Sequence, residues 1–276
     1  MISINTNYGG LYAANASRSS QALVDEAMER LSTGKRINYA KDDAAGSAIA
    51  VRLTAEIQGL AVASRNAADG QSLLDTAEGA LQETQTLLMR LRELAVQSSN
   101  GTLTTSDRGA LQAEAAALEA EISRISDTTS WGGINLLDGS LSDGITFQAG
   151  TKEGETIVAS IPDMAATAAT IAVSVGFSIG AFTNAQSMIT AVDAAISGVG
   201  TVRGNLGAVS NRLNSTIANL DQVRVNLTAS RGRIEDADFA TETGNLARAQ
   251  ILQQAATAML AQANASQASV LTLLRG

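Results

Sequence analysis

Apolar residues recur at alternating steps of three and four along two long stretches, and this pattern limits what the chain can fold into. Seven residues make nearly two turns of α-helix, so the pattern places the apolar side chains along one stripe of each helix. The stripes predict helices over Leu53–Ser98 and Asn184–Ile234, each roughly 70–75 Å long at about 1.5 Å per residue. A shorter stripe over Leu111–Ile125, with a cap at Ser106, predicts a third helix. No compact domain can contain such lengths, so we predict a mainly α fold built on a long antiparallel, coiled-coil-like helical rod.

Between the outgoing and returning helices the pattern changes to short β-like runs. Gly144–Gly150 and Glu155–Ser160 flank a turn sequence and suit a hairpin. Thr170–Ser178 can supply a further strand. Residues 131–183 are therefore predicted to form a small tip that contains a β-hairpin.

The composition excludes several classes of protein. The chain has no cysteine and no histidine among its 276 residues, which rules out disulfides, zinc cages built on these ligands and Ser-His-Asp triads. A net charge of −8 argues against nucleic acid or an anionic membrane as the main partner. No apolar run reaches the ~20 residues of a membrane-spanning helix, so membrane insertion is not expected. We expect a structural protein rather than an enzyme, with no metal and no cofactor.

The two ends of the chain are almost free of charge. Residues 1–17 carry no charged side chain, and between Thr243 and Leu274 the only one is Arg248. Both ends are nonetheless amphipathic, with Gln, Asn, Ser and Thr opposite the apolar stripe. Solvated helices normally present Lys and Glu, so these uncharged polar faces indicate close neighbours, either the chain's own domain or other subunits. We expect self-association through apolar residues of both ends: Ile4, Leu11, Leu23, Leu31, Leu246, Leu252, Met259, Val270 and Leu273.

These patterns divide the chain into three predicted parts. Residues 1–44 form an N-terminal assembly helix and linker, 45–234 the rod with its β-rich tip, and 235–276 a C-terminal assembly helix that pairs with the first. The carboxylates of Glu235–Asp238 are predicted to begin this last helix, where they favour the positive end of the helix dipole. The early part of the returning rod helix is weakened, by about 1 kcal/mol per residue relative to alanine, at four glycines: Gly198, Gly200, Gly204 and Gly207.

Several motifs in both blocks resemble the bacterial flagellin family, the subunits of the flagellar filament. The N-terminal block contains RLSTGKRIN at Arg30–Asn38, AKDDAAG at Ala40–Gly46 and NAADG at Asn66–Gly70. The C-terminal block contains SRGRIEDADFATET at Ser230–Thr243 and AQILQQA at Ala249–Ala255. Independent motifs in the right order, one block at each end, make this resemblance specific.

The resemblance implies a secreted, extracellular subunit that polymerises with itself into a helical filament for swimming motility. It implies that the terminal segments pair as helices in the filament core while the middle faces solvent. It also implies export through the flagellar type III apparatus with a chaperone, and contacts with the filament cap and with hook-junction proteins. The first residues show no cleavable secretory signal, in keeping with that route. The alternative within the same family is the hook–filament junction protein.

Members of the family are also sensed by a mammalian Toll-like receptor through a patch on the rod helices. The matching positions here are Arg90, Leu94, Gln97 and Glu114. The polar members of this set lie off the apolar stripe, so a plain subunit-packing surface is an equal interpretation.

Overall fold

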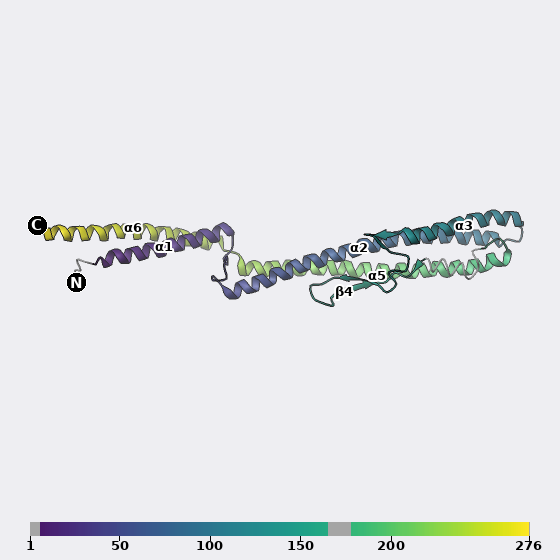
Figure 1. The fold of residues 1–276 in the computed structure, drawn as a ribbon, viewed down its shortest axis with the longest axis horizontal. Coiled ribbons are helices and arrows are strands. Elements are labelled where there is room, and N and C mark those ends of the chain that lie inside the picture. Colours follow the sequence, from purple (N-terminus) through teal and green to yellow (C-terminus); the bar gives the residue numbers. More distant parts are fainter. Residues whose placement is uncertain (1–5, 165–177, 276) are drawn as a thin grey trace. The chain divides into compact units, whose positions relative to one another are not determined.

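The structure is a computed structural model that describes residues 6–164 and 178–275, with side chains up to residue 269. The chain divides into two compact units: a terminal unit of residues 1–57 and 225–276, and a rod unit of residues 58–224. Helices α2 (Ala44–Ser98) and α5 (Phe182–Glu235) both continue from one unit into the other (Figure 1). The buried leucines lie mostly in the rod unit, whereas the buried apolar residues of the terminal unit are mostly alanines.

The predicted apolar stripes form the facing surfaces of α2 and α5 in the rod unit. Every position of the first stripe, from Leu60 to Ala95, is buried, and the stripe on α5 is buried over its first half. Two ion pairs join the helices, Arg92 Nε to Asp193 Oδ1 at 2.5 Å and Arg203 Nη2 to Glu78 Oε1 at 2.6 Å. Residue numbers rise along α2 as they fall along α5, so the two helices are antiparallel, as predicted.

The four glycines of α5 do not interrupt the helix. A Cβ built on any of Gly198, Gly200, Gly204 and Gly207 would have no neighbour within 4 Å, so these glycines serve no close packing. Val199 and Val202, which lie among these glycines, are buried. Their packing stabilises the helix here, because tertiary packing supplies most of a helix's stability.

Two helix starts differ from the sequence-based prediction. Helix α2 begins at Ala44, before the apolar stripe, because Asp43 Oδ1 accepts a hydrogen bond from the Gly46 amide at 2.8 Å. Helix α3 (Thr105–Thr128) is capped by Thr104, so the predicted cap at Ser106 was wrong. Thr104 accepts from the Asp107 amide, and the Asp107 carboxylate accepts from the Thr104 amide in return, which makes a full capping box.

The β segment consists of two short hairpins. Strands β1 (Ser130–Trp131) and β2 (Ile134–Asn135) pair across two glycines with positive φ, and β3 (Ile145–Gln148) pairs antiparallel with β4 (Thr156–Ala159). The second hairpin matches the predicted one. The further strand predicted at residues 170–178 falls almost entirely outside the described residues.

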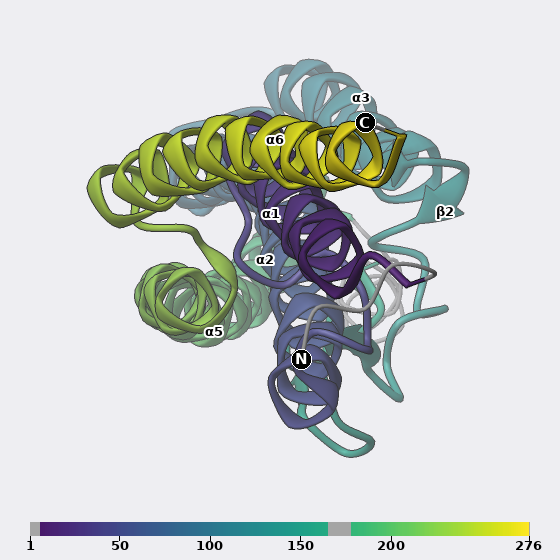
Figure 2. The same cartoon turned by 90° about the vertical axis from the view of Figure 1, so that its left-hand side faces the viewer.

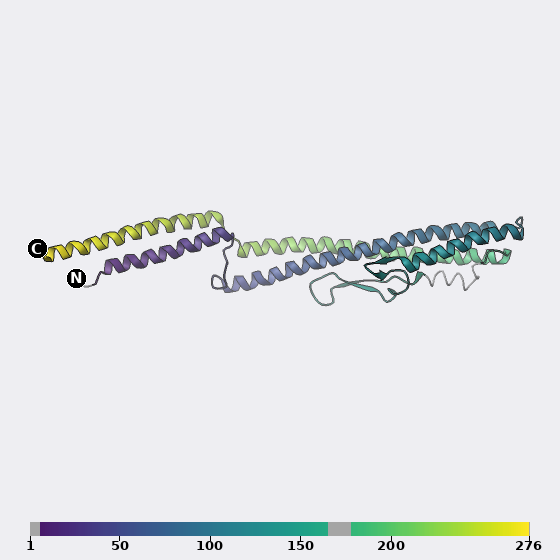
Figure 3. The same ribbon diagram turned by 45° about the horizontal axis from the view of Figure 1, so that its top comes forward.

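The β3–β4 hairpin lies along α2 (Figure 3). Its Phe147 ring packs on Gly70, where a Cβ would stand 2.9 Å from Cδ1 of the ring. Asn66 Nδ2 also donates to the carbonyl of Gln148 at 3.4 Å. The motif Asn66–Gly70 thus receives the hairpin, and its glycine is required by the close approach of an aromatic ring.

The terminal unit is built on α1 (Tyr8–Thr33) and α6 (Phe239–Arg275), which lie side by side (Figures 1 and 2). Asn7 Nδ2 donates to the Asn264 side chain at 3.3 Å near one end of the pair, and Arg30 reaches Glu242 near the other. The helices are therefore antiparallel. The predicted mainly α fold, with an antiparallel rod, a β-hairpin and paired terminal helices, is confirmed. Among the described residues no helix is long and apolar enough to cross a bilayer.

Candidate functional site

The two terminal helices meet through their smallest side chains. On α1 the buried residues are Gly10, Ala13, Ser20 and Ala27, and on α6 they include Ala249 and Ala256. Small residues at the contact allow two helix axes to approach closely. The buried face of the pair therefore contains almost no bulky side chain.

The large apolar side chains of the pair stay on its surface instead. Tyr12 is 82% exposed, Ile251 65% and Met259 63%. Tyr8, Leu11, Leu23, Met28 and Leu252 are exposed as well. This is the reverse of an ordinary amphipathic helix pair, which buries its bulky residues and leaves small or polar ones outside. A cluster of this size on one helix pair is typical of an interaction surface.

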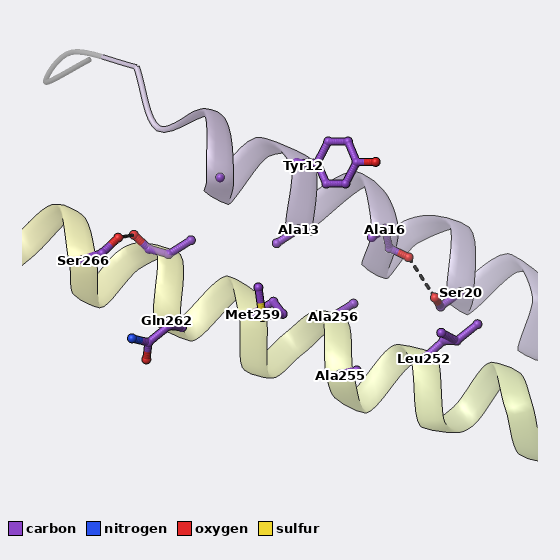
Figure 4. A pocket seen from close by; sticks show the side chains of 12 residues that line it. Tyr12, Ala13, Ala16, Ser20, Leu252, Ala255, Ala256, Met259, Gln262 and Ser266 are labelled. Atoms are coloured by element: carbon purple, nitrogen blue, oxygen red, sulfur yellow. Dashed lines mark hydrogen bonds between the residues drawn. The ribbon is translucent and has the colours of Figure 1, made fainter. Parts of the chain in front are cut away.

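Part of this exposed apolar surface is hollowed into a groove between the helices (Figure 4). The groove has a volume of about 560 Å³. Figure 4 shows Ala13 on α1 directed toward α6, and Ala256 and Met259 on α6 directed toward α1, while Gln262 points away. Ser20 donates its hydroxyl to the Ala16 carbonyl at 2.9 Å, so the polar group in this apolar wall is satisfied within its own helix.

The residues predicted for self-association fall into three groups. Leu11, Leu23, Leu252 and Met259 are exposed, with Leu252 and Met259 lining the groove. Leu31 and Leu246 are half-buried. The remaining three lie beyond the described side chains: Ile4, Val270 and Leu273.

The sequence-based prediction omitted the tyrosines of this surface. All three tyrosines of the chain, Tyr8, Tyr12 and Tyr39, lie in its first forty residues and are exposed. Tyr8 and Tyr12 lie in the uncharged segment of residues 1–17, and this was the signal that could have identified them, because aromatic residues are enriched at interfaces.

A polar cluster closes the other end of the helix pair. Glu242 is only 7% exposed. Its Oε1 lies 3.4 Å from Arg30 Nη1, and its Oε2 accepts from Asn245 Nδ2 at 3.2 Å. Glu26 Oε1 holds the same guanidinium at 2.6 Å. These residues border a second cavity of about 270 Å³, which shares Leu252 with the groove.

Beyond this cluster, the two linkers that connect the terminal pair to α2 and α5 bond to one another. The Arg36 amide donates to the Glu235 carbonyl at 2.7 Å, and the Ala237 amide donates to the Gly34 carbonyl at 2.9 Å. Lys35 Nζ pairs with Glu235 Oε1 at 2.5 Å. Gly34 has a φ of +69°, which suits glycine at the end of α1.

Two linker carboxylates organise the backbone around them. Asp42 accepts from the amides of Tyr39 and Asn38, and these bonds lower its pKa below the ordinary value. Asp238 has a lowered pKa because its carboxylate accepts from the Thr241 hydroxyl and from backbone amides at the start of α6. Asp238 alone caps α6, so the prediction that Glu235–Asp238 together begin the helix was wrong: Glu235 ends α5.

The receptor-like patch lies in the rod unit and is only partly on the surface. Arg90 Nη2 pairs with Glu114 Oε1 at 2.8 Å across α2 and α3, and Arg90 Nη1 pairs with Glu93 at 2.9 Å. These partners raise the pKa of the guanidinium. Gln97 is exposed, whereas Leu94 is completely buried. The leucine can therefore shape this surface only by packing beneath it.

Nothing in the described part of the chain resembles a metal centre. No group of three or more carboxylates gathers there with the spacing of ligands. The adjacent carboxylates of Asp42 and Asp43 accept hydrogen bonds from backbone amides instead, the first in the linker turn and the second at the start of α2.

Two family models match the chain. The model of the "bacterial flagellin N-terminal helical region" matches residues 4–142, and that of the "bacterial flagellin C-terminal helical region" matches residues 189–274. A flagellin of Halalkalibacterium halodurans is 46% identical over 268 residues, which cover 96% of this chain and 98% of that protein. Flagellin B of Vibrio cholerae is 33% identical, with 99% of each chain covered.

Solved structures show the same architecture. The crystal structure of Bacillus cereus flagellin is 30% identical, with a TM-score of 0.51 over 56% of this chain and 88% of that one. A putative flagellar hook-associated protein from Vibrio parahaemolyticus gives a TM-score of 0.62 at 17% identity, covering 71% of this chain and 100% of that one. At that identity the second likeness concerns the fold alone.

Proposed function

The chain belongs to the bacterial flagellin family, and on this premise we propose that it assembles into the extracellular flagellar filament through the apolar surface of its terminal helix pair. The family makes it a structural subunit that polymerises with itself. The proposal adds which surface of this chain drives that polymerisation.

The observation that carries the proposal is the inverted burial of α1 and α6. Their small residues face one another, while Leu11, Tyr12 and Met259 among others remain in water. Each bulky apolar side chain that becomes buried contributes about 1.5–3 kcal/mol. In a single copy these side chains stay exposed to water and the free energy of burial is not gained. It is gained when further copies cover them.

The shape of the groove also favours an open polymer. One copy offers a concave apolar wall at Ala13 and Ala256, and convex apolar side chains such as Tyr8 and Ile251 stand on the same helix pair. Contacts between two different patches of identical copies are heterologous, and they give rings or helical filaments rather than closed dimers.

We assign the parts of the chain on the same basis. Residues 1–44 and 235–276 are the assembly segments, and residues 45–234 are the rod with its β-containing segment. The chain acts through packing and is not an enzyme, since it has no histidine for general acid–base work and no cysteine to act as a nucleophile.

Further partners follow from membership of the family. We propose that the chain travels through the flagellar export apparatus with a chaperone and is added beneath a filament cap above the hook-junction proteins. For the rod unit, exposed Arg90, Gln97 and Glu114 support a Toll-like receptor patch, with Leu94 underneath. A signalling assay with purified monomer tests that patch, and lack of response at high concentration would make it a subunit-packing surface instead.

The hook–filament junction protein remains the alternative to a filament subunit. The near full-length identity to a flagellin favours the filament. Abundance discriminates the two: a filament subunit is present in great excess over any junction protein of the same flagellum.

Deletion of either assembly segment tests the proposal. Chains lacking residues 1–33 or residues 239–276 are expected to keep the helical rod unit and to form no polymer after seeding. Sedimentation and electron microscopy measure polymer growth, and circular dichroism reports the remaining helix. Growth at the rate of the full chain in either deletion would exclude the terminal helix pair as the assembly surface.

A further inference from the structure

The facing surfaces of α1 and α6 repeat every seven residues. The buried positions that follow this repeat are Ala13, Ser20 and Ala27 on α1, and Ala249 and Ala256 on α6, followed at the same spacing by half-buried Ala263. A slip of seven residues, about 10.5 Å along the helix axis, replaces one alanine by the next. Ser20 does not prevent such a slip, because it bonds its own helix.

Glu242 stands at the next position of the same series and breaks the repeat. It lies seven residues before Ala249, and among the described residues it is the only charged residue that is buried. Its carboxylate reaches Arg30 on the opposite helix. After a slip of seven residues this carboxylate would leave Arg30, and an uncompensated buried charge is strongly unfavourable.

The linkers offer a second way to fix the alignment. Their backbone hydrogen bonds and the Lys35–Glu235 ion pair join residues 34–36 to residues 235–237. The connection between α1 and α2 is nevertheless ten residues long, from 34 to 43, and ten residues can span up to about 33–36 Å. That length can accommodate a slip of one heptad.

We propose that the ion pair between Arg30 and buried Glu242 determines the register in which α6 packs on α1, while the alanine face supplies close contact without selecting a register. A single polar residue in an otherwise apolar helix seam specifies register in the same way in coiled coils. Register matters because it decides which exposed side chains border the groove. The inference rests on the proposed function, in which that groove meets another subunit.

The chain contains no cysteine, so a pair of introduced cysteines reports register directly. The position of a Cβ on Gly9 lies 3.6 Å from Cβ of Ala263, within the range of a disulfide. Gly9→Cys with Ala263→Cys therefore reports the observed register, and Gly9→Cys with Ala256→Cys reports a slip of seven residues. Polymers of the full chain are pelleted, oxidised and scored for the intrachain disulfide on a non-reducing gel.

In the parent chain, the disulfide yield of the cysteine pair that reports the observed register is expected to exceed that of the pair that reports the slip by at least about tenfold. With Arg30→Met and Glu242→Leu together, both cysteine pairs are expected to form to within about twofold of one another, because the remaining buried seam is alanine and the other side-chain bonds across it, Asn7 to Asn264 and Gln253 to Gln21, are exposed to water. The matched control is Lys35→Met with Glu235→Gln, which removes the linker ion pair and is expected to keep the parent ratio.

Each other outcome overturns the proposal. An unchanged ratio in the Arg30→Met, Glu242→Leu chain assigns the register to the linkers or the alanine face. If the linker control loses the excess of the observed-register disulfide over the slipped one, the linkers determine the register. If the double variant forms neither disulfide even when co-assembled with excess parent chain, the ion pair is required for pairing itself rather than for register. Polymer yield is measured separately by sedimentation, so a polymer with slipped helices and a failure to polymerise are distinct results.

Discussion

Met259 provides a quantitative test of the assembly surface. Its side chain is 63% exposed at the edge of the apolar groove. Full burial of a methionine side chain is worth about 1.5–3 kcal/mol, so roughly 1–2 kcal/mol remains to be gained when another copy covers it. Met259→Gln keeps the length of the side chain and its helix propensity but puts an amide where the partner presents apolar atoms.

The expected result is a rise in the critical concentration for polymerisation of about 5–30-fold, the factor that corresponds to 1–2 kcal/mol. The assay is sedimentation of seeded polymer over a range of subunit concentrations. Thermal unfolding of the soluble chain should not change, because the methionine makes few contacts within one copy. The matched control is Val158→Thr on β4, which also alters an exposed apolar residue, 50% accessible, but lies in the rod unit. The reasoning is refuted if Met259→Gln assembles at the parent concentration, or if Val158→Thr raises the critical concentration as much.

Three further predictions concern stability. Gly79→Ala should raise the free energy of unfolding by about 1 kcal/mol, because alanine favours the helix and a Cβ there meets no atom. The free energy of unfolding of Gly70→Ala should be at least about 1 kcal/mol lower than that of Gly79→Ala, since its new Cβ collides with Phe147. Urea unfolding of both variants makes the comparison. Leu81→Ala, at a completely buried position of α2, should lower the free energy of unfolding by about 2–5 kcal/mol, and a loss below 1 kcal/mol would mean that the seam is not a packed core. The ionised Asp238 carboxylate stabilises the start of α6, and its pKa is lowered as a result. This contribution is complete at pH values above the ordinary pKa of about 3.9 and disappears as the pH falls through the lowered pKa. Amide-exchange protection of residues 240 and 241 should therefore drop in acid, and Asp238→Ala should abolish that pH dependence.

The sequence was most informative where helices pack through a regular stripe. Alternating steps of three and four identified the buried face of α2 correctly from Leu60 to Ala95. The stripe underestimated how much of α2 is buried: Leu73 and Leu94 are covered as well. They belong to a core that includes α3 and the β segment, and a single stripe cannot predict contacts on a second face of a helix.

Local chemistry could be predicted in part, and long-range contacts could not. The capping box at Thr104 and Asp107 was readable from their spacing, because a hydroxyl three residues before an acid is its signature. Gly70 was recognisable only as a weak position in the stripe. Its reason is a contact with Phe147, far away in the sequence, which no periodicity contains.

The candidate assembly surface shows the same division. The low charge of both ends predicted an interface. In the structure, the residues of one apolar stripe separate into small side chains that are buried and large side chains that are exposed, and the exposed ones are available for an interface. Ala256 and Met259 are only three residues apart on α6, yet the first is buried and the second is not. Which of two neighbouring apolar residues faces α1 depends on the rotation of the helix, and the stripe was too wide to settle it.

The contact between Phe147 and Gly70 has a practical consequence for chimeras of this chain with its relatives. A hairpin transplanted from another protein will seat on α2 only if its aromatic ring comes at the right place and the recipient helix keeps its glycine. The two positions must therefore be exchanged together, although 76 residues of intervening chain separate them. Epitope insertions are better directed to the turn beside Gly154, where a Cβ would meet no atom within 4 Å, and the glycine itself is best kept because its φ is +83°.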